Sequence, residues 1–151
     1  MTMNQQTAQP LKVGSTVGTN QASSLVAIPT TESFTTFGGT SQLLGAAWTP
    51  SDINNSGFGI RLSVASSASG FSSNYLDATN FGFAVAASDT IVGIQFDVRW
   101  VASGNGTSSA TVSVNYVRAT ITTTAAVYKS AVNLIDGPAL GFSGFKSGSN
   151  L

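Results

Sequence analysis

The chain has 151 residues, a length typical of one domain with its own core, and only 8% of its residues are charged. Six Lys and Arg balance six Asp and Glu, so there is no basic stripe to neutralise the phosphates of a nucleic acid. Cys and His are both absent, which excludes disulfides, thiolate or imidazole metal sites, and cysteine nucleophiles.

The first residues lack the basic and apolar segments of a secretory signal, and no run approaches the roughly 20 apolar residues that span a bilayer. We therefore expect neither a nucleic acid nor a membrane among the partners of this chain. Ser, Thr and Gly are abundant, and the frequent Thr, Val, Ile and Phe residues suit a half-buried pleated surface. The composition predicts an all-β protein.

Residues 1–28 are small and polar, with isolated apolar positions such as Leu11 and Val26. We expect an N-terminal arm with a possible first strand here, followed by a β-sandwich domain over residues 29–124. In that domain Phe34 and Phe37 lead into a Gly-rich turn, and the apolar run at 43–48 predicts a short buried strand.

A short helix is predicted from Pro50 to Asn54. Thr49 can cap it, Pro50 is favoured at its first position, and Asp52 can return a hydrogen bond to the cap. The Asn- and Gly-containing residues 54–57 should end it. The alternation over residues 58–64 then predicts a strand, whose inward side chains are Phe58, Ile60, Leu62 and Val64.

Residues 91–100 form the clearest strand pattern. One face carries Ile94, Phe96, Val98 and Trp100, and the other carries Gln95, Asp97 and Arg99. A turn at 103–107 leads to a returning strand over 111–121, where the apolar phase slips by one residue. Because such a slip reverses every later side chain, we expect either a bulge near Tyr116 or a stretch that is buried on both faces.

Residues 125–151 leave the alternating pattern and predict a C-terminal arm. Four apolar side chains in this arm need a surface to cover them, which belongs either to the same domain or to a neighbouring subunit. We therefore assign candidate assembly contacts to Leu134, Ile135, Phe142 and Phe145.

Catalytic groups are scarce, so we predict no enzyme, no catalytic residue, no cofactor and no metal. A Ser or Thr nucleophile would need a lysine, and Lys12, Lys129 and Lys146 all lie in the expected arms. Asp52 is interpreted as a helix cap and Asp97 as part of a solvated strand face. Asp77, Asn80 and Asp89 could supply some Ca²⁺ ligands, but no calcium-loop motif accompanies them.

The remaining polar and aromatic residues are interpreted structurally. Arg61, Arg99 and Arg118 occur in strands near Asp97 in the pattern, which favours cross-strand charge pairs, with an interface patch as the alternative. Trp48 and Trp100 lie in apolar runs and are expected in the core rather than on a sugar-stacking platform.

Five segments carry a resemblance to a known class of protein, namely residues 37–45, 48–54, 58–60, 91–94 and 114–121. They resemble the Gly-, Ser- and Thr-rich jelly-roll modules of virion and appendage proteins from tailed bacteriophages. In those modules a block like residues 74–100 precedes a block like residues 34–64. The order is reversed here, as in a circularly permuted sandwich.

The predicted fold is an antiparallel β-sandwich of the jelly-roll type with one short helix and extended terminal arms. The resemblance implies a capsid decoration or cement protein, made in the host cytoplasm and located in the virion. Its partners would be copies of itself, for example in a trimer, and other virion proteins such as the major capsid protein. The alternatives are a fibre or tail component and a lectin-like module that binds a receptor or glycan.

Overall fold

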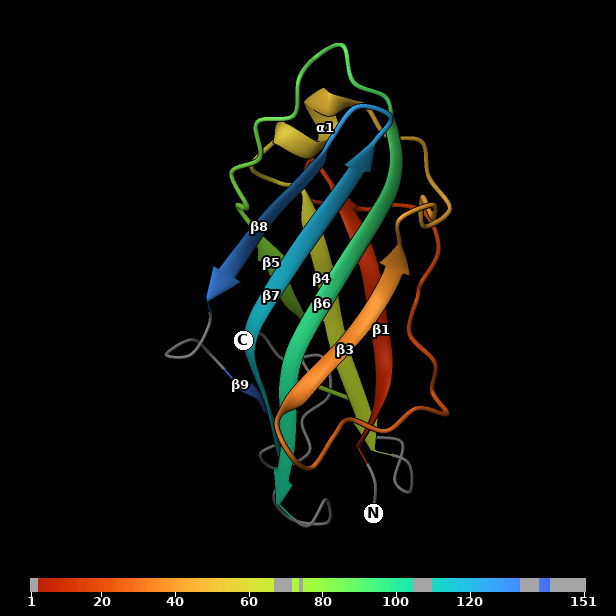
Figure 1. Cartoon of the computed structure of the whole chain (residues 1–151). Helices are drawn as coiled ribbons and strands as arrows, with labels where there is room; N and C mark the ends of the chain where they lie inside the picture. The colour runs from red at the N-terminus through yellow and green to blue at the C-terminus, as the bar shows by residue number, and fades with distance from the viewer. Residues whose placement is uncertain (1–2, 67–71, 74, 105–109, 134–138, 142–151) are drawn as a thin grey trace.

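The computed structural model describes residues 3–66, 72–73, 75–104, 110–133 and 139–141 (Figure 1). These residues form two packed antiparallel β-sheets with one short helix at one end. The predicted all-β antiparallel sandwich with one short helix is therefore confirmed. Its jelly-roll connectivity remains a prediction.

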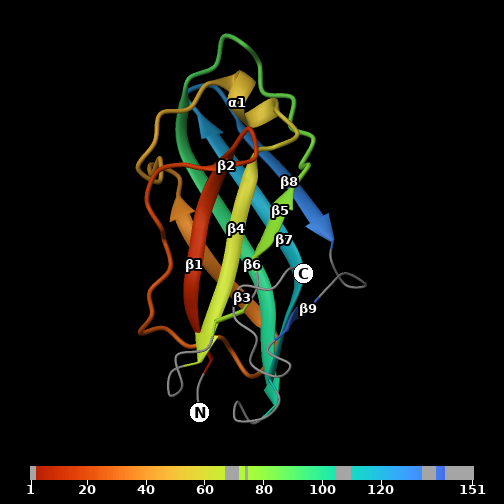
Figure 2. The same cartoon turned by 180° about the vertical axis from the view of Figure 1, so that it is seen from behind.

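Sheet A has the strand order β2-β1-β4-β5 and faces the viewer in Figure 2. Its central strands are β1, which spans Met3–Lys12, and β4, which spans Gly59–Ser66. The borders are the short strands β2, Ser15–Thr16, and β5, Leu76–Thr79. All neighbouring strands run antiparallel.

Sheet B has the order β3-β6-β7-β8, and β9 also pairs with β7. The long hairpin of β6 and β7 forms its centre. The bounds are Ser33–Gly39 for β3, Ile91–Gly104 for β6, Ala110–Thr123 for β7, Val127–Asn133 for β8 and Ala139–Gly141 for β9.

The core between the sheets is centred on aromatic rings. Phe58, next to β4 of sheet A, stacks on Phe96 from β6 of sheet B with 5.6 Å between ring centroids. Trp48 meets the same Phe58 edge-on at 5.6 Å. A buried Phe contributes about 1.5–3 kcal/mol, so these contacts hold the sheets together. The predicted inward faces of residues 58–64 and 94–100 are confirmed as buried, as are Trp48 and Trp100.

The helix α1 spans Pro50–Asn54, as predicted, and closes one end of the sandwich. The Thr49 hydroxyl accepts a hydrogen bond from the Asp52 amide at 3.2 Å, and the Asp52 carboxylate accepts one from the Thr49 amide at 2.9 Å. Asn54 then bonds both backbone groups of Val85, at 2.7 and 2.9 Å. The cap and this amide clamp fix a helix too short to be stable alone.

The predicted irregularity near Tyr116 is a bulge. Arg99 pairs with Tyr116 and Trp100 pairs with Val114, so Asn115 has no partner residue on β6. The extra residue shifts the alternation of β7 by one position. Apolar side chains therefore face the core both before and after the bulge, which explains the slip in the apolar phase.

The apolar run at 43–48 does not form the predicted strand. It contains turns, and Leu44 and Gly45 have φ angles of 57° and 80°, which lie outside the extended backbone region of a regular strand. The Thr19 amide donates to the Leu44 carbonyl at 2.9 Å, and the Trp48 indole donates to the Leu43 carbonyl at 2.9 Å. The run is apolar because it covers the end of the core, not because it is part of a sheet.

Parts of the two expected terminal arms are strands: the possible first strand within residues 1–28 is β1, and residues 127–133 of the expected C-terminal arm form β8. β1 lies inside sheet A and pairs with β4 over most of its length, and β8 pairs with β7. The alternation in β1 is hidden by a register shift between Gln5 and Thr7, which moves the buried side chains from odd to even positions. Lys12 and Lys129 consequently lie in strands.

Candidate binding surface on sheet B

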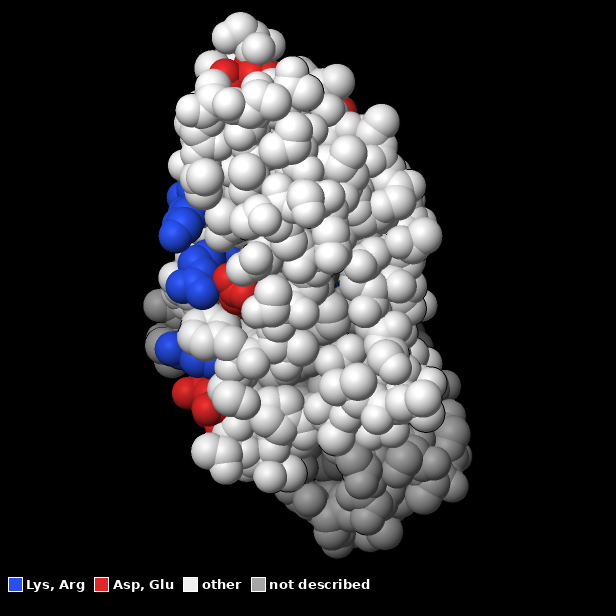
Figure 3. Space-filling model, turned by 45° about the vertical axis from the view of Figure 1, so that its right-hand side comes forward, with Lys and Arg blue, Asp and Glu red and all other residues white. Residues whose placement is uncertain are grey.

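A column of charged side chains runs along one face of the molecule, and most of the remaining visible surface is uncharged (Figure 3). It belongs to the outer face of sheet B. We call this surface the sheet B face and define it by the outward side chains of four adjacent strands: Phe34, Thr36, Gln95, Asp97, Arg99, Tyr116, Arg118, Thr120, Thr122, Val127 and Lys129.

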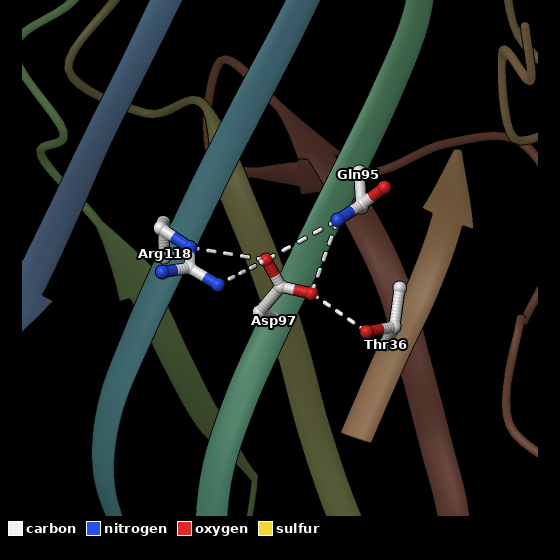
Figure 4. Close-up of polar contacts among 4 residues, drawn as sticks. All are labelled: Thr36, Gln95, Asp97 and Arg118. Atoms are coloured by element: carbon white, nitrogen blue, oxygen red, sulfur yellow. Dashed lines mark hydrogen bonds and ion pairs between the residues drawn. The ribbon is translucent and has the colours of Figure 1, made fainter. Parts of the chain in front are cut away.

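Asp97 is the centre of the sheet B face (Figure 4). Its carboxylate accepts hydrogen bonds from the Thr36 hydroxyl at 2.7 Å and from the Gln95 amide at 3.1 and 3.3 Å. The Arg118 guanidinium donates from Nε at 3.1 Å and from Nη2 at 3.0 Å. Three strands therefore converge on one carboxylate.

Asp97 is only 3% exposed, so its interpretation as part of a solvated strand face is wrong. It does point away from the core, but Thr36, Gln95 and Arg118 close over it. Burial by itself raises the pKa of the Asp97 carboxyl. The hydrogen bonds from Thr36, Arg118 and Gln95, together with the charge of Arg118, outweigh burial and lower this pKa below its ordinary value.

An aromatic and arginine cluster adjoins Asp97. The rings of Phe34 and Tyr116 meet edge-on with 6.1 Å between centroids. The Arg99 guanidinium lies 5.3 Å from the Tyr116 centroid and 5.9 Å from that of Phe34, and Arg118 lies 5.3 Å from Phe34. Glu32 pairs with Arg99 at 3.8 Å and accepts a hydrogen bond from Asn115 at the bulge.

The cluster is half open to solvent, because Phe34 is 46% exposed. Sequence reasoning placed Arg61, Arg99 and Arg118 near Asp97. The Arg118–Asp97 pair is confirmed, whereas Arg61 lies on sheet A and pairs with Asp77. Sequence reasoning missed Phe34 and Thr36 as members of the same surface. Their two-residue spacing was the available signal, because it sets both on one face of a strand.

An open depression of about 370 Å³ continues the sheet B face toward β8. Within the described part of the chain, the Lys129 ammonium has no acidic partner and the Thr122 hydroxyl has no hydrogen-bond partner. The depression thus offers unused polar groups beside an ordered ion pair. The lining residues are Thr40, Gln95, Asp97, Arg118, Thr120, Thr122, Val127 and Lys129.

The other candidate residues have structural partners or lie outside the described residues. Asp77 accepts two hydrogen bonds from Arg61, at 2.7 and 2.9 Å, and Asp89 accepts from Thr123 and Tyr128. No group of three His, Cys, Asp or Glu that could hold a metal occurs among the described residues. The predicted assembly contacts Leu134, Ile135, Phe142 and Phe145, as well as Lys146, lie outside those residues.

Comparison of the chain with protein-family models, curated proteins and solved structures found no match. Among the residues that the structure describes, no helix is long and apolar enough to cross a membrane.

Proposed function

We propose that this chain is a non-enzymatic structural subunit of a tailed-bacteriophage particle, with the role of a capsid decoration or cement protein. Its fold would be a jelly roll, its location the virion, and its partners copies of itself and other virion proteins such as the major capsid protein. The resemblance of residues 37–45, 48–54 and 114–121 to phage modules supports the assignment to a phage particle.

The observation that carries the proposal is the state of Asp97. A general acid or base needs a pKa near the working pH and a free position toward its substrate. The pKa of Asp97 is instead lowered, and hydrogen bonds from three side chains occupy its oxygens. The sheet B face is therefore suited to present a rigid patterned surface to another protein rather than to perform proton transfer.

Assembly would also use the C-terminal residues Leu134, Ile135, Phe142 and Phe145. Because β8 and β9 pair with β7, a chain shortened before them would lose strands of sheet B. A chain that ends at Gly141 keeps these strands and removes both phenylalanines, so it separates the contribution of the last residues from that of the fold.

The proposal is tested first by light scattering of the full chain and of the chain that ends at Gly141. The full chain is expected to form a closed oligomer such as a trimer, and the shortened chain a smaller species. Mass spectrometry of purified particles from a phage that encodes the chain should then detect it in stoichiometric amounts. Its absence from such particles would overturn the assignment to a virion.

A second candidate function is supported by the depression next to Asp97. Three Thr side chains, Gln95, Arg118 and Lys129 converge there, and a lectin-like or receptor-binding module places such polar groups around a shallow site. Trp48 and Trp100 are 8% and 0% exposed and do not contribute to a sugar platform, whereas Phe34 and Tyr116 lie on the same face.

A glycan array probed with the full chain and with Lys129→Ala separates the two candidates. Specific binding that the Lys129→Ala substitution removes would favour the binding module, as part of a fibre or tail. No binding on the array, together with a stable oligomer, would favour the structural subunit.

A further inference from the structure

The borders of the two sheets are protected to different degrees. An unpaired strand edge exposes N–H and C=O groups that can pair with another chain, and proteins usually block such edges. On one side of sheet A, β2 pairs only with Leu11 and Lys12, and residues 17–28 block the rest of the β1 edge. Backbone bonds join Gln5 to Val26 at 2.9 Å, Ile28 to Met3 at 2.7 Å and Gln21 to Ala8 at 2.9 Å.

Two other borders carry features that disfavour pairing. β5 has only four residues, and one of them is Asp77, which is ion-paired with Arg61. β8 carries the exposed Lys129 near its middle. Short length and charged side chains, lysine above all, are the devices by which natural sheets keep their edges unpaired.

The β3 border has none of these features. β3 is seven residues long, contains no charged residue and no proline, and pairs with β6 without a register shift. No backbone hydrogen bond from another described segment reaches the outer border of β3 from Ser33 to Gly38. Figures 1 and 2 show β3 at one border of sheet B, with β8 at the other.

We propose that the outer edge of β3 pairs antiparallel with β3 of a second copy of this chain. This pairing joins the two B sheets into one continuous sheet. This inference deepens the proposed function and rests on it. A twofold axis perpendicular to the sheet keeps both sheet B faces on the same side. Phe34 and Thr36 of one copy then lie beside the same two residues of the other.

Several features of β3 favour a second copy of this chain as the partner that pairs with its outer edge. β3 itself carries no charge, so two copies do not repel one another along the strand. Phe34 is 46% exposed, and a cross-strand neighbour would cover its ring. The C-terminal residues of a neighbour fit less well, because Phe142 and Phe145 are three residues apart and an added strand would point them to opposite faces.

The first experiment compares Phe34→Lys with Val127→Lys by light scattering of the full chain. Both place a lysine at an exposed apolar position of sheet B, but on opposite borders. We expect Phe34→Lys to weaken self-association about tenfold or more and Val127→Lys to leave it unchanged. Blue-shifted emission from the buried Trp48 and Trp100 confirms that each variant is folded. Equal masses for both variants would overturn the interface.

The second experiment uses the absence of cysteine, because a single introduced cysteine can form only an intermolecular disulfide. We expect rapid disulfide dimers from Phe34→Cys, from Thr36→Cys or from a mixture of the two, depending on the residue at the twofold axis. Val127→Cys serves as the control for random collision. Rapid dimers only between Val127→Cys and Phe34→Cys would show that β3 pairs with β8, which would overturn the twofold arrangement.

The two proposals can fail separately. If the full chain forms oligomers that Phe34→Lys does not weaken but removal of residues 142–151 does, the β3 interface is wrong and the structural role stands. If the full chain is a monomer and is also missing from purified particles, both proposals are wrong.

Discussion

Two ion pairs, one on each sheet, look alike in chemistry and differ in surroundings. On sheet A, Arg61 donates two hydrogen bonds to Asp77, of 2.7 and 2.9 Å, and the Asp77 side chain is 37% exposed. On sheet B, Arg118 reaches one oxygen of Asp97 at 3.0 and 3.1 Å, and the Asp97 side chain is 5% exposed.

The pair with the better geometry is the one expected to contribute less to stability. Water competes for both partners of the Arg61–Asp77 pair, and exposed pairs of this kind contribute about 0–1 kcal/mol. Asp97 has lost most of its water and depends on protein donors, so removing any of them leaves a poorly solvated charge. The two sheets thus allow the effect of burial to be measured with similar partners.

The largest effect is expected for Asp97→Ala. It leaves the Thr36 hydroxyl and the Gln95 amide without their acceptor and removes the partner of Arg118. We expect a loss of about 2–3 kcal/mol in the free energy of unfolding, measured by urea denaturation. A loss no greater than that of Asp77→Ala would show that burial does not distinguish the two pairs.

A change in pH should alter the contribution of Asp97 to the free energy of unfolding. The lowered pKa of Asp97 means that the unfolded chain takes up a proton more readily than the folded chain. The stabilisation is therefore complete above the ordinary pKa of about 4 and is lost as pH falls through the lowered pKa of the folded protein.

Urea denaturation between about pH 7 and pH 2 checks this expectation. The difference in stability between the wild type and Asp97→Asn should shrink steadily toward the acid end. Burial raises the pKa of Asp52, but the hydrogen bonds of the helix cap and the charge of Lys12 lower it below its ordinary value, so Asp52 adds its own acid sensitivity to both proteins equally. A constant difference across the range would contradict the assignment.

A smaller effect is expected at the covered border of sheet A. The Asn20 side chain accepts from the Ala8 amide at 2.8 Å and donates to the Gln6 carbonyl at 2.8 Å, so it holds the covering segment on β1. Asn20→Ala should cost about 1 kcal/mol and promote self-association through the uncovered β1 edge. Light scattering and urea denaturation measure the two effects.

The matched control for this edge is Gln21→Ala, since among the described residues the Gln21 side chain bonds only to Thr19 of the same segment. It should leave the mass in solution unchanged. If both variants keep the solution mass of the wild type, residues 17–28 do not prevent self-association through the β1 edge.

The smallest effect is expected for Asp77→Ala, at no more than about 0.5 kcal/mol. Arg61 remains exposed to water and keeps its contact with the Tyr75 ring, at 5.1 Å from the centroid. Urea denaturation beside Asp97→Ala gives the comparison. A loss above 2 kcal/mol would place the exposed pair among the main contributors to stability and reverse the ranking.

The strands with clear alternation could be predicted from the sequence. In residues 58–64 and 94–100 every second side chain is large and apolar, and the structure buries those positions. The helix cap at Thr49 was also predictable, because its hydrogen bonds join residues only three positions apart. Local rules suffice where the partners are local.

Non-local contacts explain what the sequence pattern missed. β1 contains Asn4, Gln5 and Gln6, and its register shift breaks the alternation, so only its pairing with β4 makes it a central strand. The run at 43–48 is apolar because it covers the end of the core between the two sheets. Asp97 is buried by Thr36 and Arg118, which are 61 and 21 residues away along the chain.

The central position of β1 has a consequence for how the protein is made. β1 leaves the ribosome before its partner β4, which begins at Gly59, so these two central strands of sheet A cannot pair until the residues between them have been synthesised. Sheet B begins later still, because β3 must wait for β6. Such distant pairings fold slowly and leave strand edges open meanwhile. Because the chain carries few charges, electrostatic repulsion does little to keep these nascent strands apart from the nascent chains of neighbouring ribosomes on a polysome.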